Sequence, residues 1–115
     1  KPMFGLDLSS GARAGLTAFL SGVARSVAEH NVTINNILPG MFDTDRLRQG
    51  LDAKAKMTNE SINIIANQMT SSVPAKRFGN PEEFGEACAF LCSTHAGYIT
   101  GQNLLLDGGL FESSF

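Results

Sequence analysis

Charged residues are scarce in this sequence, because they make up 17% of its 115 residues and the formal net charge at pH 7 is only −2. So small a net charge provides none of the basic surface that binds nucleic acid, and no nucleic-acid partner is expected. Long apolar runs are also missing, since none approaches the ~20 residues that cross a bilayer, and no membrane partner is expected. The 43% of hydrophobic residues is nevertheless enough for a buried core in one domain.

Cysteine is almost as scarce. Cys88 and Cys92 are the only two, and they lie four residues apart in ACAFLCS. A disulfide at that spacing would be strained. Only His95 is near enough to act as a further metal ligand, so no metal site is predicted. The two residues are predicted to be buried free thiols, which fits a protein of the reducing cytoplasm.

Two regular elements are predicted in the first third of the chain. Apolar residues recur at every third or fourth position, which indicates an amphipathic helix over about residues 9–29. The β-branched run VTINNIL (32–38) then predicts a buried strand that ends in a turn at Pro39 and Gly40. Because a helix that leads directly into a strand is half of a β-α-β crossover, we expect an α/β fold with a parallel sheet.

The middle of the chain, residues 41–78, is more polar and predicts one or two short helices on a long excursion between sheet elements. Such excursions are usually lids or binding segments. Another helix is predicted to begin after Asn80, a good N-cap, with Pro81 at its first position. The run QNLLLDGG (102–109) predicts a second buried strand. Since a two-stranded sheet cannot cover its own faces, this order of helix, strand, lid, helix and strand predicts the second half of something larger.

Two stretches resemble motifs of one enzyme family. The segment RFGNPEEFGEACAFLCSTHAGYITGQNLLLDGG (77–109) resembles the C-terminal signature of the short-chain dehydrogenase/reductase family. The segment VTINNILPGMFDT (32–44) resembles the strand and Pro-Gly turn that lie beside the nicotinamide in that family. The resemblance extends from about Ser9 to Gly109 and is strongest to 3-oxoacyl-carrier-protein reductases.

The resemblance implies a Rossmann-type doubly wound parallel sheet. Residues 1–115 would be the C-terminal portion of a single NAD(P)-binding domain whose N-terminal half is missing. It also implies hydride transfer between NAD or NADP and a small-molecule carbonyl or alcohol substrate, in a homodimer or homotetramer. Which of the two cofactors is used is left open, because the family's selector residue would lie upstream of residue 1.

The family's catalytic Tyr-x-x-x-Lys pair has no direct counterpart here. Counting back from Pro39 places the family's tyrosine on Ser9 and its lysine on Arg13, and the chain's one tyrosine, Tyr98, lies in the AGYITG motif. A serine hydroxyl is far less acidic than a phenol, whereas arginine can still hydrogen-bond a ribose diol. As alternatives, Ser9 caps the helix and Arg13 is a solvated charge. A catalytically impaired relative, acting as a dinucleotide- or ligand-binding or structural subunit, is therefore the second hypothesis.

The resemblance also predicts a cofactor-binding wall. Pro39 and Gly40 would line the nicotinamide, the backbone around Phe42 would meet the carboxamide, and the Thr44 hydroxyl would approach the amide or the pyrophosphate. The alternatives are an ordinary turn at the strand end and a cap on the following helix, and capping and binding can coexist at Thr44. Asn35, in the preceding strand, is expected to make structural hydrogen bonds.

Overall fold

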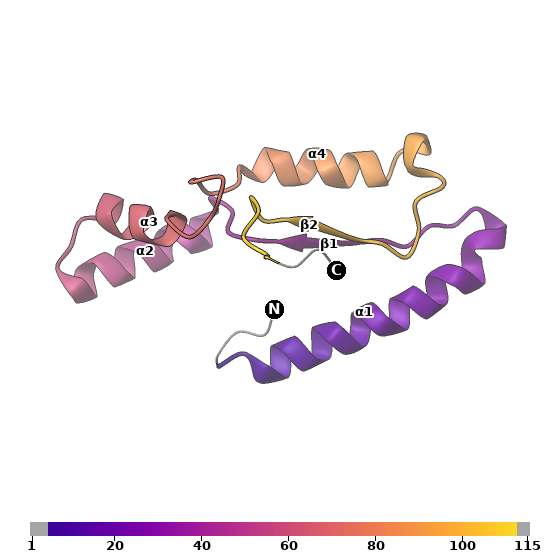
Figure 1. Ribbon diagram of the computed structural model, residues 1–115, viewed down its shortest axis with the longest axis horizontal. Helices are drawn as coiled ribbons and strands as arrows, with labels where there is room; N and C mark the ends of the chain where they lie inside the picture. Colours follow the sequence, from indigo (N-terminus) through magenta and orange to yellow (C-terminus); the bar gives the residue numbers. More distant parts are fainter. Residues whose placement is uncertain (1–4, 113–115) are drawn as a thin grey trace. The chain divides into compact units, whose positions relative to one another are not determined.

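The computed structural model describes residues 5–112. Its helices, 3₁₀ turns and strands follow the predicted order of helix, strand, lid, helix and strand (Figure 1). The elements are α1 (Asp7–Val27), η1 (Ala28–His30), β1 (Asn36–Pro39), α2 (Asp45–Thr58), α3 (Ile62–Thr70), α4 (Pro81–Leu91), η2 (Thr94–Ala96) and β2 (Asn103–Leu106). Within the described residues, no helix combines the length and the apolar character that a membrane crossing requires.

The described residues fall into two compact units. One contains residues 5–37 and 88–104, and the other contains residues 38–87 and 105–112. The two strands, β1 and β2, pair with each other. The register advances in the same direction on both strands, because the amide of Asn36 donates to the carbonyl of Gln102 and the amide of Gly40 donates to that of Leu106, both at 2.8 Å. The predicted parallel sheet is confirmed.

In the first unit, helix α1 begins earlier than predicted. Its first residue is Asp7 and its N-cap is Leu6, which provides no side-chain cap, so Ser9 lies inside the first turn. The prediction of Ser9 as the N-cap was wrong. The carboxylate of Asp7 in the first turn suits the positive end of the helix dipole, which explains a start two residues before the serine. Asn31, at a left-handed φ of 58°, ends the following 3₁₀ turn.

Strand β1 is shorter than predicted, because residues 32–35 make irregular contacts before the ladder begins. The Asn35 side chain uses both of its polar groups there. Its Nδ2 donates to the carbonyl of Ile99 at 2.8 Å, and its Oδ1 accepts from the amide of Gln102 at 3.1 Å. The expectation that Asn35 makes structural hydrogen bonds is confirmed. At this point the Asn35 side chain, rather than the backbone, connects the two segments.

The two cysteines are free, as predicted, but the prediction that they are buried was wrong. Cys88 and Cys92 are both exposed, and helix α4 has no buried residue within the described part of the chain. Helical spacing places both thiols on one side of the helix but does not determine whether another element covers that side. The position of the cysteines was predictable from the sequence, and their burial was not.

The second unit contains the predicted excursion, residues 41–78. We call residues 41–79 the lid. Its two helices pack on each other around Leu51, Ala55 and the fully buried Ile65. Each helix has a side-chain cap: Thr44 Oγ1 accepts from the amide of Leu47 at 3.3 Å, and Ser61 caps α3 in the same way. The prediction of one or two short helices is confirmed, and the lid has a small core of its own.

Gly40→Ala tests the close approach of the two strand ends. A Cβ at Gly40 would lie 2.7 Å from both Cα and Cβ of Asp107, while the Gly40 amide stays tied to Leu106. Because backbone has to move, we expect a loss of about 1–3 kcal/mol in the free energy of unfolding, measured by urea denaturation of the full-length protein. Gly85→Ala is the control, since a Cβ there meets nothing within 4 Å. Equal losses in the two variants would contradict the expectation.

Candidate functional site

The predicted wall residues lie together at the carboxyl end of β1. Pro39 ends the strand, and the chain continues through Gly40, Met41 and Phe42 to Thr44, which caps helix α2. In open α/β sheets, ligands bind outside the carboxyl ends of the strands. The segment from Pro39 to Thr44 therefore occupies the position in the fold where a ligand is expected.

One side of this segment faces a groove of about 640 Å³ beneath the lid helices, which we call the lid groove. All four predicted wall residues line it. Met41, from the same segment, lines it as well, and helices α2 and α3 supply the rest of its lining: Arg46, Leu47, Gly50, Leu51, Lys54 and Met69. These lid residues were not predicted as site residues, although Arg46, Gly50 and Lys54 recur every fourth position and could have been recognised as one helix face.

The groove can bind a ligand but lacks an acid–base group for neutral pH. Its described lining contains no histidine, cysteine, tyrosine or carboxylate. Its two ionisable side chains are Arg46 and Lys54. The Thr44 hydroxyl accepts a hydrogen bond from the Leu47 amide and still has its own proton to donate to a ligand. Helix capping and ligand binding by Thr44 are thus compatible.

The Phe42 ring helps to hold the wall in place. It meets the ring of Phe84 edge to face, with centroids 5.7 Å apart and planes at 85°. A Cβ at Gly79 would lie 2.7 Å from this ring, so only glycine fits beside it. The same two residues form a parallel bridge, in which the Gly79 amide donates to Met41 at 2.9 Å and the Asp43 amide donates to Gly79 at 2.8 Å. Sequence analysis missed this role of Gly79.

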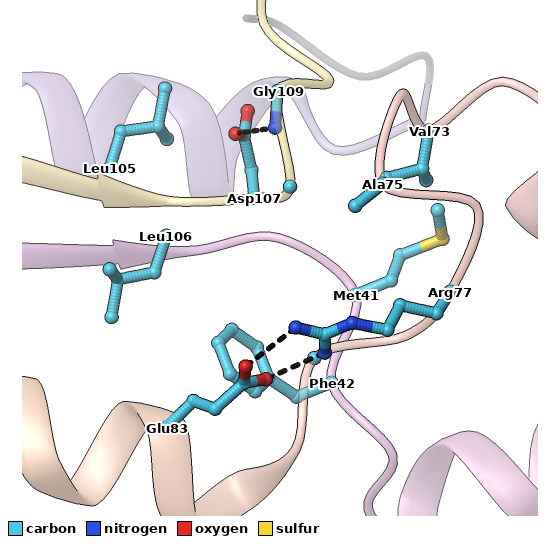
Figure 2. Close-up of a pocket in the computed structure, with 12 residues that line it drawn as sticks. Met41, Phe42, Val73, Ala75, Arg77, Glu83, Leu105, Leu106, Asp107 and Gly109 are labelled. Atoms are coloured by element: carbon cyan, nitrogen blue, oxygen red, sulfur yellow. Dashed lines mark hydrogen bonds and ion pairs between the residues drawn. The ribbon is translucent and has the colours of Figure 1, made fainter.

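A second hollow, of about 270 Å³, also borders Met41 and Phe42 (Figure 2). Its charged side chains are all engaged. Both oxygens of Glu83 accept from the Arg77 guanidinium, at 2.6 and 2.7 Å, and Glu83 Oε2 also accepts from the Asn80 amide. Asp107 accepts from the amides of Gly109 and Phe111. These partners fix the ends of the lid and of β2, so we assign this hollow a structural role.

The two residues predicted as counterparts of the family's catalytic pair are Ser9 and Arg13. They lie one turn apart on α1, in the first compact unit, whereas the wall residues lie in the second. Ser9 is half-buried and Arg13 is exposed. Their catalytic and ribose-binding roles therefore stay predictions. Tyr98, in the first unit as well, is fully exposed. Within residues 5–112, no cluster of three or more metal-ligating side chains occurs.

Residues 4–111 match the family described as enoyl-(acyl carrier protein) reductase. A solved structure of a short chain dehydrogenase family protein from Francisella tularensis superposes with a TM-score of 0.82 at 29% identity, over 96% of this chain and 45% of its own. The chain belongs to the short-chain dehydrogenase/reductase family. The predicted fold class, α/β with a Rossmann-type doubly wound parallel sheet, is confirmed by this similarity.

Curated relatives in the short-chain dehydrogenase/reductase family include two reductases. The chain is 37% identical over 100 residues to the NADPH-dependent reductase BacG of Bacillus subtilis, covering 87% of this chain and 39% of the relative. It is 38% identical to the 3-oxoacyl-[acyl-carrier-protein] reductase FabG of Escherichia coli, covering 87% and 36%. The chain thus spans less than half the length of these relatives.

Two further family structures are informative. L-sorbose reductase from Gluconobacter frateurii, solved with NADPH and L-sorbose, matches with a TM-score of 0.90 at 26% identity over 97% of this chain and 43% of its own. A short chain oxidoreductase from Pseudomonas aeruginosa, described as NADPH-bound with an atypical catalytic center, matches with a TM-score of 0.75 at 29% identity over 91% and 39%.

The shared carboxylate of Glu83 gives a pH-dependent prediction. The hydrogen bonds from the Arg77 guanidinium have the largest effect on Glu83, and the one from the Asn80 backbone amide is second. Together they lower the pKa of Glu83 from 4.5 to about 2. Because the folded-state pKa is depressed, the stabilisation is complete above about pH 4.5 and disappears as the pH falls toward 2. The difference in Tm between the wild type and Glu83→Gln should therefore shrink over this range, measured by circular dichroism.

Glu82→Gln is the matched control. Glu82 lies in the same helical turn, and its side chain makes no hydrogen bond or ion pair with residues 5–112. Its Tm difference from the wild type should vary less with pH. A difference for Glu83→Gln that stays constant between pH 5 and about pH 2 would contradict the assignment of the ion pair.

Proposed function

We propose that this protein is an NAD(P)-dependent oxidoreductase that transfers hydride to or from a small carbonyl or alcohol substrate. The observation that supports this most is the lid groove, in which Pro39, Gly40, Phe42 and Thr44 line one surface at the carboxyl end of β1. Within that proposal, residues 1–115 are the C-terminal portion of a single NAD(P)-binding domain. The names of the NADPH-dependent relatives favour NADP over NAD.

The wall residues fit such a cofactor. Pro39 and Gly40 offer a flat surface without a long side chain, suited to a planar ring. The backbone at Phe42 supplies amide and carbonyl groups for a carboxamide, and Thr44 has a hydroxyl proton to donate. The nicotinamide, when bound, supplies or accepts the hydride. The chain's own contribution is to orient that ring and to cover it with the lid.

The proton for a carbonyl reduction has to come from elsewhere, since the described groove lining holds no acid for neutral pH. We place the family's catalytic pair at Ser9 and Arg13, with Arg13 as the ribose-binding cation. The similarity to an oxidoreductase described as having an atypical catalytic center supports a departure from the usual pair. The second candidate is a catalytically impaired relative that binds a dinucleotide or another ligand, or serves as a structural subunit, and the serine at position 9 favours it.

The same proposal includes a homodimer or homotetramer in the cytoplasm. On helix α1 the apolar side chains Leu8, Leu16 and Phe19 are exposed among the described residues, with 92%, 55% and 67% of their surfaces accessible, and this face is available to the rest of the domain and to a second subunit. An exposed apolar face of this kind is typical of an interface. The two free thiols support a reducing compartment.

Oxidation of NADPH and NADH by the full-length protein tests the activity. We expect turnover with members of a panel of ketones and aldehydes, followed by the loss of absorbance of the reduced cofactor. Calorimetry should show binding of at least one of the two cofactors. Cofactor binding without turnover on any carbonyl would support the impaired relative, and the absence of both would contradict the proposal.

Ser9→Tyr tests the position of the missing acid. A positioned general acid contributes about 10²–10⁴ to a rate. If Ser9 stands where the family's tyrosine stands, the variant should have a kcat at least about tenfold above that of the wild type. Ser10→Tyr is the control, because it adds the same side chain one residue away, turned by about 100° around the helix. Equal effects of the two variants would contradict the placement.

A further inference from the structure

Two positive charges line the lid groove without a counter-charge. Arg46 and Lys54 both lie on α2, and neither side chain makes a hydrogen bond or ion pair with residues 5–112. Their neighbour Arg48 is different, since its guanidinium forms two hydrogen bonds with Asp43, at 2.8 and 2.9 Å. No carboxylate belongs to the described groove lining. The charged side chains of the described lining are thus both positive, and both are exposed where a ligand's oxyanion can reach them.

A glycine separates the two cations. Gly50 lies four residues from each, so the three positions form one row along α2, about 12 Å from end to end. Glycine is a poor residue for a helix interior. Packing does not require it here, because a Cβ at Gly50 would meet no atom within 4 Å. The effect of the glycine is to leave the groove open between Arg46 and Lys54.

The rest of the helix-borne lining is apolar. Leu47 and Leu51 lie beside the row on α2, and Met69 faces the groove from α3. A ligand that fits these surfaces has an apolar part for the three side chains and an anionic group for the two cations. Charge-assisted hydrogen bonds from arginine and lysine to phosphate or carboxylate oxygens are among the strongest in proteins.

We propose that the lid groove selects a carbonyl substrate that has an apolar chain and an oxyanion, either a phosphate or a carboxylate, held by Arg46 and Lys54. This inference rests on the proposed oxidoreductase function and defines its substrate class. A cofactor phosphate is the other possible source of the anion. Arg46 lies only two residues from Thr44, the residue proposed to approach the cofactor, but Lys54 lies ten residues beyond Thr44, about 15 Å along the helix. The position of Lys54 therefore favours the substrate.

Binding of hexyl phosphate to the full-length protein tests the anion site without requiring turnover. By calorimetry, Arg46→Gln combined with Lys54→Gln should weaken hexyl phosphate by about tenfold or more, and hexanol should bind the wild type and this variant equally. Lys54→Gln and Lys56→Gln form a matched pair on one helix, and Lys56 is not part of the groove lining. Only Lys54→Gln should weaken hexyl phosphate.

Gly50→Leu tests the shape of the lid groove without changing its charge. It retains both cations and introduces a good helix former, so the helix is not weakened. The leucine would occupy the space between Arg46 and Lys54, and both hexyl phosphate and hexanol should then bind more weakly. The inference is overturned if hexyl phosphate does not bind the wild type, or if Lys54→Gln and Lys56→Gln weaken it equally.

Two further measurements identify the source of the anion and separate this inference from the proposed activity. If the double variant weakens NADPH about tenfold and leaves hexyl phosphate unchanged, the cations serve the cofactor and the inference is wrong. In turnover, levulinate should have a higher kcat/KM than its neutral methyl ester, and the double variant should abolish the preference. Equal turnover of the two overturns the inference while the activity stands. Binding of hexyl phosphate that depends on the two cations, without any turnover, overturns the activity while the anion site stands.

Discussion

The parallel bridge between Phe42 and Gly79 is the contact on which the site depends. It joins the two ends of a lid of nearly forty residues through two backbone hydrogen bonds, and it requires a glycine beside the Phe42 ring. Closing a loop of that length costs conformational entropy, which short-range contacts have to offset. The Arg77–Glu83 pair and the Phe42–Phe84 contact lie at the same place and strengthen the closure. Because the bridge holds Phe42 in place, it also holds the segment from Pro39 to Thr44 that contains it.

The two hollows next to this wall differ in how their charges are satisfied. In the smaller one, Arg77, Glu83 and Asp107 all have protein partners, which makes the region rigid (Figure 2). In the lid groove, Arg46 and Lys54 have none among the described residues. Both side chains are exposed, so a ligand that enters the groove can reach them without displacing a protein partner. The two hollows thus differ in that the charges of the smaller one are paired within the described part of the protein and those of the lid groove are not.

The sequence predicted those features that depend on local chemistry. The start of α4 is an example, because Asn80 was predicted as its N-cap and Pro81 as its first residue, and the helix begins at Pro81 with Asn80 Oδ1 accepting from the Glu82 amide. The order of elements was equally accessible, whereas the cofactor-binding role of the wall residues stays a prediction. The start of α1 and the burial of the cysteines were not, because both depend on what surrounds a helix rather than on its own residues. The pairing of Phe42 with Gly79 was hidden for a similar reason, since its partners are far apart in the chain.

The lid's own core has a consequence for how the groove can change. Leu51, Ala55 and Ile65 pack within the excursion, and Asn59 closes the turn between its helices at a left-handed φ of 54°. Residues added or removed at that turn would leave the bridge and the sheet register untouched. The lid is therefore a module whose length and lining can diversify independently of the framework. New ligand preferences could arise in this protein through changes at the distal turn, while the wall from Pro39 to Thr44 keeps its geometry.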